Sequence, residues 1–349
     1  MKILRLPVYV VFVLLLALGS STLRGQDIHF TLYPMTPLAF NPANTGAFYG
    51  SYRISLLYRD QYRSITGNGA YMTPTFSVDV PVIRGFKKTD WVGVGMFFYS
   101  DKSGDAGLTQ SSFKISAAYH WALNKKGTST LSIAYQTGAI QREVKDIQKL
   151  RFEDALVNGG TSLDLSNIDN MKKGYLDHVG GLKFTSKYNK TDEFNIGIAA
   201  GKFGQPDWSV LTAGGNYRVD PRVHAQIGMS RLMSDKVRFL PNISYQKIWG
   251  KPASTLVVQG YLDYLYNEQK NIILKGGLGY RSGSGIGDAI QVMLGADIDQ
   301  IRVMLGYDIN ISSLSAASGT FGAIELAAQY IGKIYKRPKP DPIIFCPRF

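Results

Sequence analysis

Polar and apolar residues alternate with a period of two along four long stretches of the chain. In the first stretch, from Tyr49 to Gln61, Arg53 and Arg59 fall on one face, and Ile54 and Tyr58 fall on the other. A helix, with about 3.6 residues per turn, could not segregate these residues, so the pattern indicates a β-strand. The other three stretches run from Thr255 to Tyr264, from Ile301 to Ile311 and from Ala323 to Lys333.

The length of these stretches separates a membrane barrel from a soluble β-sandwich, since the strands of both alternate. Each stretch has about ten to thirteen residues, whereas strands of soluble proteins commonly have about five or six. Tyrosines gather near the ends of the stretches, as in an interfacial girdle; they are Tyr49, Tyr58, Tyr62, Tyr261, Tyr264 and Tyr266. The pattern predicts an all-β fold, a transmembrane antiparallel β-barrel of the outer membrane. A secreted β-sandwich is the alternative.

Further strands are predicted by the same alternation and by the turn residues between them. They lie near 70–82, 91–101, 109–122, 128–141, 177–188, 193–203, 209–218, 222–231, 237–249, 270–281 and 288–298. With the four long stretches these make about fifteen, yet bacterial single-chain barrels have an even number of strands. The pattern is weakest over 203–231, where Gly204, Pro206 and Pro221 interrupt it. Fourteen strands are therefore predicted.

Most connections between the predicted strands are short, and one is long. It runs from about Arg142 to Gly174 and contains a charged segment of helical character, Glu143 to Val157. Long loops belong on the extracellular side of outer-membrane barrels, and strand counting from a periplasmic N-terminus places this one there.

The first 25 residues have the three parts of a secretory signal peptide. Lys2 and Arg5 are basic, Val8 to Leu18 is apolar, and small residues precede an expected cleavage point between Gly25 and Gln26. The apolar run is too short for the alternative, a membrane anchor. The predicted organisation is a signal peptide (1–25), a proline-bearing segment that plugs the lumen (26–46), the transmembrane barrel (47–335) and a periplasmic C-terminal tail (336–349).

Composition supports alternating membrane strands and raises the question of charge. The chain of 349 residues has 37 glycines and 21 tyrosines, and its mean hydropathy is −0.07, as expected of strands with one lipid-facing and one polar face. The formal net charge of +13 would also suit nucleic acid. The basic residues are scattered through the strands, however, and no nucleic-acid-binding module accompanies them. Outer-membrane lipid is an expected partner and nucleic acid is not.

No catalytic, cofactor-binding or metal-binding constellation is predicted. The single cysteine, Cys346, cannot form an internal disulfide, and the four histidines lack metal-ligand spacing. The glycines of Ser282 to Gly287 lack the lysine and helix of a phosphate-binding loop. An outer-membrane enzyme is thus disfavoured. The two-residue period instead places charged side chains in the lumen, where they pair with one another or line a channel; these are Arg53, Arg59, Asp263, Arg302, Asp308 and Glu325.

Motifs near both ends of the chain resemble the PorP/SprF family of the type IX secretion system. Asn41–Gly46 followed by Tyr58–Tyr62 is similar to the family opening NPAxxG … YRxQW. Gly93–Gly95 followed by Asp101–Gly104 is similar to the GiG … DkxG segment. Tyr62 departs from the pattern, since the family usually has tryptophan there.

The C-terminal motifs follow in the family order. Gly306–Ile309, then Ser313-Leu314 and Glu325, resemble GYDis … S-L … hEi, and Cys346–Phe349 resembles a family terminus. Ala323-Ile324 departs from the Gly-His-type residues common before the glutamate, and residues 142–300 align only loosely. The motif residues are Asn41, Pro42, Gly46, Tyr58, Arg59, Gln61, Asp101, Gly104, Gly306, Tyr307, Asp308, Glu325, Cys346, Pro347 and Phe349.

The resemblance implies a fourteen-stranded, non-enzymatic barrel without a cofactor that works with the type IX export machine. Family members help a large adhesin reach and stay on the cell surface, in gliding motility for example, or link the secretion apparatus to the envelope. The implied partners are the C-terminal domain of a large secreted surface protein and periplasmic or secretion components. The alternative function is an outer-membrane channel or hydrophobic-solute transporter. The long loop at 142–174 is expected to contact the partner, its alternative role being to cover the barrel mouth.

Overall fold

The computed structural model describes residues 28–84, 89–150, 172–189, 191–206, 218–283, 286–313 and 315–334. The predicted signal peptide, the C-terminal tail and the predicted strand at 209–218 lie outside the described residues, wholly or for the most part. No helix among the described residues is both long and apolar enough to cross a membrane.

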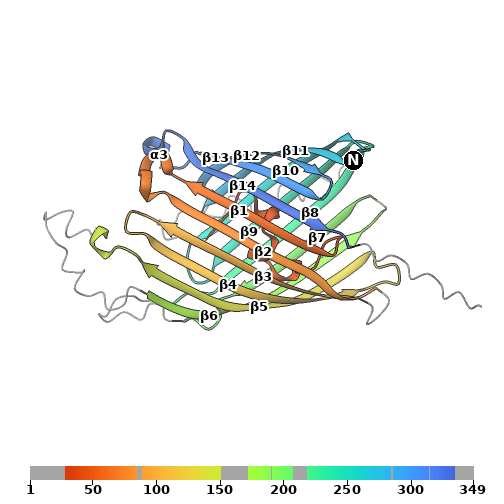
Figure 1. Cartoon of the computed structure of the whole chain (residues 1–349), viewed down its shortest axis with the longest axis horizontal. Coiled ribbons are helices and arrows are strands. Elements are labelled where there is room, and N and C mark those ends of the chain that lie inside the picture. The colour runs from red at the N-terminus through yellow and green to blue at the C-terminus, as the bar shows by residue number, and fades with distance from the viewer. Residues whose placement is uncertain are drawn as a thin grey trace, which may run out of the picture.

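The described strands form one closed antiparallel barrel of fourteen strands, in which sequence neighbours pair throughout (Figure 1). The strands are β1 (Tyr52–Gln61), β2 (Tyr71–Arg84), β3 (Trp91–Ser103), β4 (Leu108–Ala122), β5 (Ser129–Val144), β6 (Lys172–Lys187), β7 (Glu193–Gly201), β8 (Arg222–Ser234), β9 (Val237–Ile248), β10 (Ser254–Asn267), β11 (Ile272–Gly283), β12 (Ile286–Ile298), β13 (Ile301–Asn310) and β14 (Phe321–Gly332). The barrel closes between β1 and β14, with Tyr52 opposite Gly332 and Gln61 opposite Ala323. The predicted fold class and strand number are confirmed.

Short helices lie before β1 and in the connections. They are η1 (Tyr33–Met35), α2 (Pro37–Phe40), η2 (Pro42–Asn44), α3 (Arg63–Thr66), η3 (Gly67–Gly69), η4 (Ile147–Lys149) and α5 (Ser315–Ser318). Each of the three before β1 has a proline in its first turn. Proline is tolerated there but cannot donate to a strand ladder, so this part of the chain coils instead of joining the wall.

The connections at the two ends of the barrel differ in length. The start of β1 and the end of β14 lie at one end, where the connections 123–128, 235–236, 268–271 and 299–300 are short. The opposite end carries the connections 62–70, 145–171, 202–221 and 311–320. Outer-membrane barrels have short periplasmic turns and longer extracellular loops, so the first end is the periplasmic end and the second is the extracellular end.

Two details of the long loop differ from the sequence prediction. β5 continues through Val144 and β6 begins at Lys172, so the connection is 145–171 and not 142–174. The prediction that a helix begins at Glu143 is wrong, because Glu143 lies in β5 and pairs with Lys172 of β6. Only the single 3-10 turn Ile147–Lys149 is present before residue 150, and the remainder lies outside the described residues. Pairing between β5 and β6 satisfies backbone groups that a short solvent-exposed helix would leave open at its ends.

Burial alternates along the strands as the two-residue period predicts. In β1, Ser55 is 1% exposed and faces the lumen, whereas the next residue, Leu56, is 50% exposed and faces outward. Tyr58, Tyr264 and Tyr266 lie on the outer surface, as expected of girdle residues. Tyr261 does not: it is buried inside the barrel, so the girdle assignment is wrong for it. Its odd position in the alternation, opposite to Tyr264, explains the difference.

Cysteine labelling in a Cys346→Ser background should follow this alternation. A thiol at position 56 or 305 is expected to react with a lipid-phase reagent, and one at 55 or 304 to resist it, because Leu56 and Leu305 face outward while Ser55 and Met304 are buried. Adjacent positions serve as each other's controls. Reaction at 55 and 304 with protection at 56 and 305 would mean that the register is reversed.

Candidate functional site: the filled lumen

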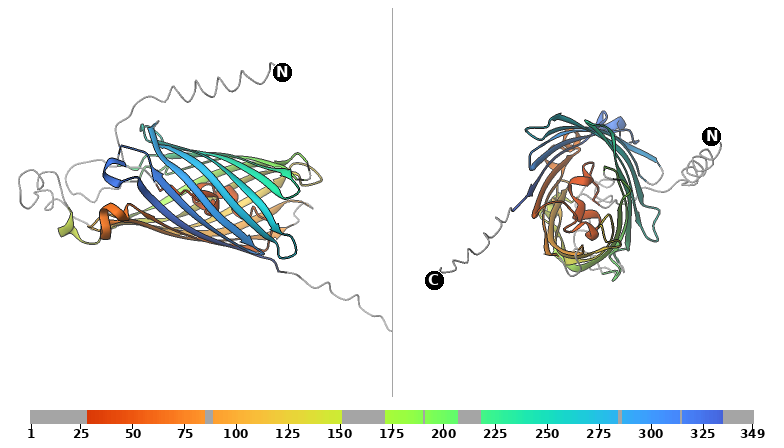
Figure 2. Two further views of the ribbon diagram at one scale, coloured as in Figure 1. Left: turned by 90° about the horizontal axis from the view of Figure 1, so that it is seen from above. Right: turned by 90° about the vertical axis from the view of Figure 1, so that its right-hand side faces the viewer.

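Residues 28–46 lie inside the barrel and are called the plug here. Figure 2 shows them, in red and orange, within the ring of strands when the barrel is viewed along its axis. The plug contacts the wall in three zones, which run from the extracellular half of the lumen to the periplasmic half: an ionic cluster, an apolar zone and a periplasmic anchor.

The ionic cluster holds the start of the plug. The Glu325 carboxylate accepts hydrogen bonds from the backbone N–H of Thr31 at 2.8 Å and of Leu32 at 2.7 Å. Arg59, which lies opposite Glu325 in the β1–β14 ladder, forms ion pairs with Glu325 and, at 3.1 Å, with Asp308. The hydroxyl of Thr31 donates to Asp308 as well.

Further groups complete the cluster. Arg281 donates to Asp308 at 2.8 Å and to Asp288 at 2.5 Å. Glu325 and Asp308 are each 1% exposed, so these charges are shielded from water. A buried charge is tolerated when it is paired and hydrogen-bonded, as here. The cluster therefore fixes the position of the plug backbone against β1, β13 and β14.

An apolar zone occupies the middle of the lumen. Phe30, Leu32, Tyr33 and Met35 of the plug are buried against inward-facing apolar residues of the wall. These wall residues are Leu57, Val257, Tyr261, Met293, Met304 and Ala327. A water-filled lumen would leave them hydrated, so their burial by the plug stabilises the closed arrangement through the hydrophobic effect.

The periplasmic anchor holds the end of the plug. Asp79 accepts from the Gly46 N–H at 2.7 Å and from Arg53 at 2.9 and 2.7 Å. Arg53 also donates to the carbonyl of Asn44 at 3.0 Å. The ring of His120 lies 2.7 Å from the Thr45 carbonyl through Nε2, and the indole N–H of Trp91 donates to the Gly46 carbonyl at 2.9 Å.

Asn41 ties the middle of the plug to β6 and β7. Its side-chain amide donates to the carbonyls of Leu182 at 3.1 Å and Ile198 at 3.3 Å, and its oxygen accepts from the Ala43 N–H at 2.9 Å. The Asn-Pro pair of the opening motif thus starts η2 and joins it to the wall.

Glycines of the wall make room for the plug. A Cβ on Gly93 would lie 2.3 Å from the Thr45 carbonyl oxygen, and one on Gly181 would lie 2.3 Å from Asn41 Oδ1. Gly46, whose φ is +70°, faces Gly93 at the same contact. Part of the high glycine content therefore reflects close backbone contact with the plug.

The Gly93→Ala substitution is expected to loosen the plug by about 1–3 kcal/mol, because the methyl group meets backbone atoms that cannot rotate away. Limited proteolysis of the N-terminal segment, together with thermal unfolding in detergent, measures the effect. Gly180→Ala is the matched control, since a Cβ there meets nothing within 4 Å. Equal behaviour of the two variants would contradict the close contact.

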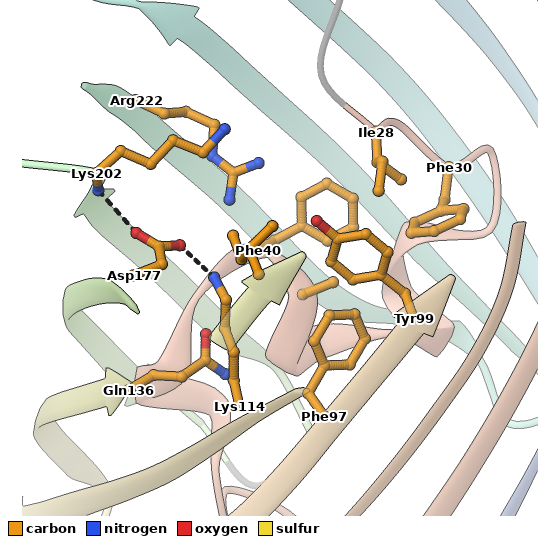
Figure 3. Close-up of a pocket in the computed structure, with 12 residues that line it drawn as sticks. Ile28, Phe30, Phe40, Phe97, Tyr99, Lys114, Gln136, Asp177, Lys202 and Arg222 are labelled. Carbon is orange, nitrogen blue, oxygen red and sulfur yellow. Dashed lines mark hydrogen bonds and ion pairs between the residues drawn. The ribbon is translucent and has the colours of Figure 1, made fainter. Parts of the chain in front are cut away.

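A small cavity lies beside the plug toward the extracellular end (Figure 3). Aromatic side chains, including Phe97 and Tyr99, lie on one side and charged groups on the other. The Lys114 ammonium forms an ion pair with the Asp177 carboxylate at 2.5 Å, and the backbone N–H of Lys202 donates a hydrogen bond to the same carboxylate at 3.1 Å. The cavity volume of about 30 Å³ is the space of a single water molecule and does not accommodate a hydrocarbon.

The predicted lumen-facing residues fall into three groups. Arg59, Asp308 and Glu325 belong to the ionic cluster, and Arg53 belongs to the periplasmic anchor. Asp263 and Arg302 lie near the periplasmic ends of their strands and are joined through Lys275 and Asp297. Lys275 contacts Asp263 at 2.5 Å and Asp297 at 3.3 Å, and Arg302 contacts Asp297 at 2.7 Å.

The remaining motif residues take several places. Gln61 accepts from Arg59 at 3.1 Å, and Asp101 accepts from Thr73 at 2.6 Å. Gly104 has a φ of +72° in the tight turn after β3, a backbone conformation that favours glycine.

Other motif residues lie in the plug or at the outer surface. Pro42 and Gly46 belong to the plug, and Gly306 lies against Leu32 of the plug. Tyr58 and Tyr307 line an outer-surface pocket at the extracellular rim. Cys346, Pro347 and Phe349 lie outside the described residues.

Sequence reasoning missed Asp79, Arg281, His120 and the Lys114–Asp177 pair. A signal for Asp79 is present in the strand it belongs to, where every second residue is polar and buried; the set is Thr73, Thr75, Ser77 and Asp79. His120 is a hydrogen-bonding partner of the plug. Within the described part of the chain, no cluster of three or more His, Cys, Asp or Glu residues could hold a metal ion.

Fold and lumen together define an outer-membrane β-barrel whose interior is filled by its own N-terminal segment. The chain belongs to the PorP/SprF family: the sequence model described as type IX secretion system membrane protein PorP/SprF matches residues 22–330. The protein is thus an outer-membrane component of type IX secretion, and membership implies interaction with other secretion components. The PorP/SprF family is not a family of enzymes, and the barrel fold does not mark the chain as one.

Solved structures with a similar fold are outer-membrane barrels. The toluene transporter TodX of Pseudomonas putida has a TM-score of 0.51 and 11% identity, covering 84% of this chain and 92% of its own. A TodX mutant described as a monoaromatic hydrocarbon channel has a TM-score of 0.50 and 10% identity, with 85% and 94% covered. A Pseudomonas aeruginosa FadL homologue has a TM-score of 0.46 and 12% identity, with 83% and 92% covered. A search of curated proteins gives no match.

Proposed function

We propose that this barrel binds and anchors, or helps export, a large protein of the cell surface, and does not pass small solutes. The observation that carries the proposal is the filled lumen: the plug is tied to the wall by the ionic cluster at one end and by the periplasmic anchor at the other. A barrel with its interior occupied in this way acts through its two rims. Membership of the PorP/SprF family supports a protein partner.

The extracellular rim is the proposed contact surface for the C-terminal domain of the surface protein. The longer connections, 62–70, 145–171 and 202–221, are all at this end. Charged side chains there, such as the exposed pair of Asp146 with Lys149 and the exposed Arg63 paired with Asp60, suit the polar rim of a protein interface. A connection as long as 145–171 is uncommon in a compact fold unless it has a function.

A hydrophobic-solute transporter is the second candidate, favoured by the TodX fold. At 11% identity this likeness concerns the fold alone. Beside Phe97 and Tyr99, in the extracellular half of the lumen, the cavity of about 30 Å³ is too small for an aromatic hydrocarbon, which argues against passage through that part of the barrel in this arrangement.

The test is deletion of residues 151–170, which leaves β5 and β6 intact. We expect loss of one surface protein from the cell surface while the barrel itself stays in the outer membrane. Mass spectrometry of proteins that co-elute with the intact barrel, extracted from native membranes, identifies the partner. Its absence from the deletion extract would link it to the loop.

The control is substitution of the exposed periplasmic turn residues Lys125 and Lys126 by serine, which leaves the extracellular rim unchanged. A barrel that purifies alone, retains all surface proteins after the deletion and transports toluene into vesicles would belong to the transporter class instead.

A further inference from the structure

A second cavity, of about 200 Å³, lies beside the plug in the half of the lumen nearer the periplasmic end. The plug and Ala47 form one side, and β1, β6, β7, β8 and β9 form the other. Arg53 and Asn195, which line it, lie within two residues of the periplasmic starts of β1 and β7. A cavity of about 150 Å³ accommodates benzene, so this one can hold a group the size of one amino-acid residue.

The polar residues that line this cavity include four with side-chain amides and two with cationic side chains, and none of the described lining residues is acidic. The six are Asn44, Asn195, Gln226, Asn242, Arg53 and Lys183. Arg53 is already paired with Asp79. Of the two cationic side chains in the described lining, Lys183 is therefore the one that is not ion-paired with a carboxylate.

Lys183 differs from the other lysines of the lumen. Lys114 and Lys275 each contact a carboxylate at 2.5 Å. Lys183 donates to the neutral Asn44 Oδ1 at 2.8 Å, and among the described residues no carboxylate lies within ion-pair distance of it. An ammonium group has three donors, so an anion in the cavity could accept from it.

Tyr33 provides a second, independent observation. Tyr33 is one of the residues that line the same cavity, it is only 8% exposed, and its buried hydroxyl has no hydrogen-bond partner. Buried polar groups are rarely left without a partner, because the missing bond costs free energy. Burial raises the pKa of the Tyr33 phenol, so it remains protonated and can donate.

We propose that this cavity binds the terminal carboxylate of a peptide, with Lys183 and the Tyr33 hydroxyl as donors to the carboxylate. The amide side chains of Asn195, Gln226 and Asn242 match the donors and acceptors of the peptide backbone. Pro34, Pro37 and Phe40 form an apolar wall for the side chain of the last residue. A neutral sugar would satisfy the amides but would leave the ammonium without a counter-charge. The inference is independent of the surface-protein proposal.

The probe is N-acetyl-Ala-Ala as the free acid, titrated calorimetrically into the full-length protein in detergent. The amidated peptide is expected to bind at least about tenfold more weakly, since hydrogen bonds to charged groups contribute that much or more. Lys183→Met should weaken binding of the acid by at least about tenfold, and Tyr33→Phe by about three- to tenfold. Lys183→Arg should retain binding because the charge remains.

Lys187→Met, at the exposed periplasmic end of the same strand, is the matched control and should bind like the parent. Retained heat-modifiable migration establishes that each variant is folded, and Tyr33→Phe keeps the test decisive if Lys183→Met fails to fold. Equal binding of acid and amide, unchanged binding by Lys183→Met and Tyr33→Phe, equal affinity for inorganic phosphate or glucose, or no binding at about 10 mM peptide would each overturn the proposal.

Discussion

Deletion of residues 29–46 is expected to turn the barrel into an open channel for ions. The interior of an eight-stranded barrel is filled by the side chains of its own strands, whereas a sixteen-stranded barrel leaves an aqueous channel. This barrel has fourteen strands and is therefore nearer in size to the second kind. Removal of the plug also exposes the inward charges, such as Arg59 and Glu325, to water. We expect single-channel conductance in planar bilayers to rise by about tenfold or more over that of the full-length protein.

The full-length protein in the same bilayers is the reference for this deletion. Heat-modifiable migration on gels separates an inserted barrel from a misfolded one. Comparable conductance of the two proteins would mean that residues 29–46 do not close the lumen, and the transporter class would then be favoured.

Glu325→Ala is expected to destabilise attachment of the plug by about 3–5 kcal/mol. Removal of one member of a buried ionic group leaves its partners without compensation. Here the Thr31 and Leu32 N–H groups lose their acceptor, and among the described residues Arg59 keeps only Asp308 as an acidic partner. The predicted result is faster proteolysis of the N-terminal segment and a lower thermal unfolding midpoint in detergent.

Two further variants, one conservative and one at an exposed turn, serve as comparisons for Glu325→Ala. Glu325→Gln should have a smaller effect, because the amide keeps one acceptor for the plug backbone. Glu268→Ala, in an exposed periplasmic turn, should leave both measurements unchanged. If Glu325→Ala behaved like Glu268→Ala, the ionic cluster would not hold the plug.

The ionic cluster and the periplasmic anchor differ from surface ion pairs in what they determine. Buried pairs gain little net stability over apolar packing, because desolvation offsets their attraction. Their geometry is specific, however, and it involves plug backbone groups at Thr31, Leu32, Asn44 and Gly46. The apolar zone supplies the burial, and the charged groups fix where along the lumen the plug lies.

The sequence by itself determined the wall of the barrel. Residues that face lipid must be apolar and a strand alternates its faces, so the two-residue period alone assigns Leu56 and Leu305 to the outside, and Arg59 and Glu325 to the inside. All backbone groups in a membrane must be paired, which requires a closed sheet and favours the even count of fourteen. The motifs at Asn41–Gly46 and Gly306–Asp308 pointed to the family.

Only the tertiary structure decided what the inward face does. The period of two says that Arg59 points inward, but it carries no information about Glu325, 266 residues away, or about Arg281 on another strand. Apolar inward residues such as Leu57 and Tyr261 are exceptions to the pattern within their own strands, and the plug that covers them accounts for both. Alternation reports the environment on each side of one strand, whereas a filled lumen depends on contacts between segments far apart in the chain, and these are fixed only when the barrel closes around the plug.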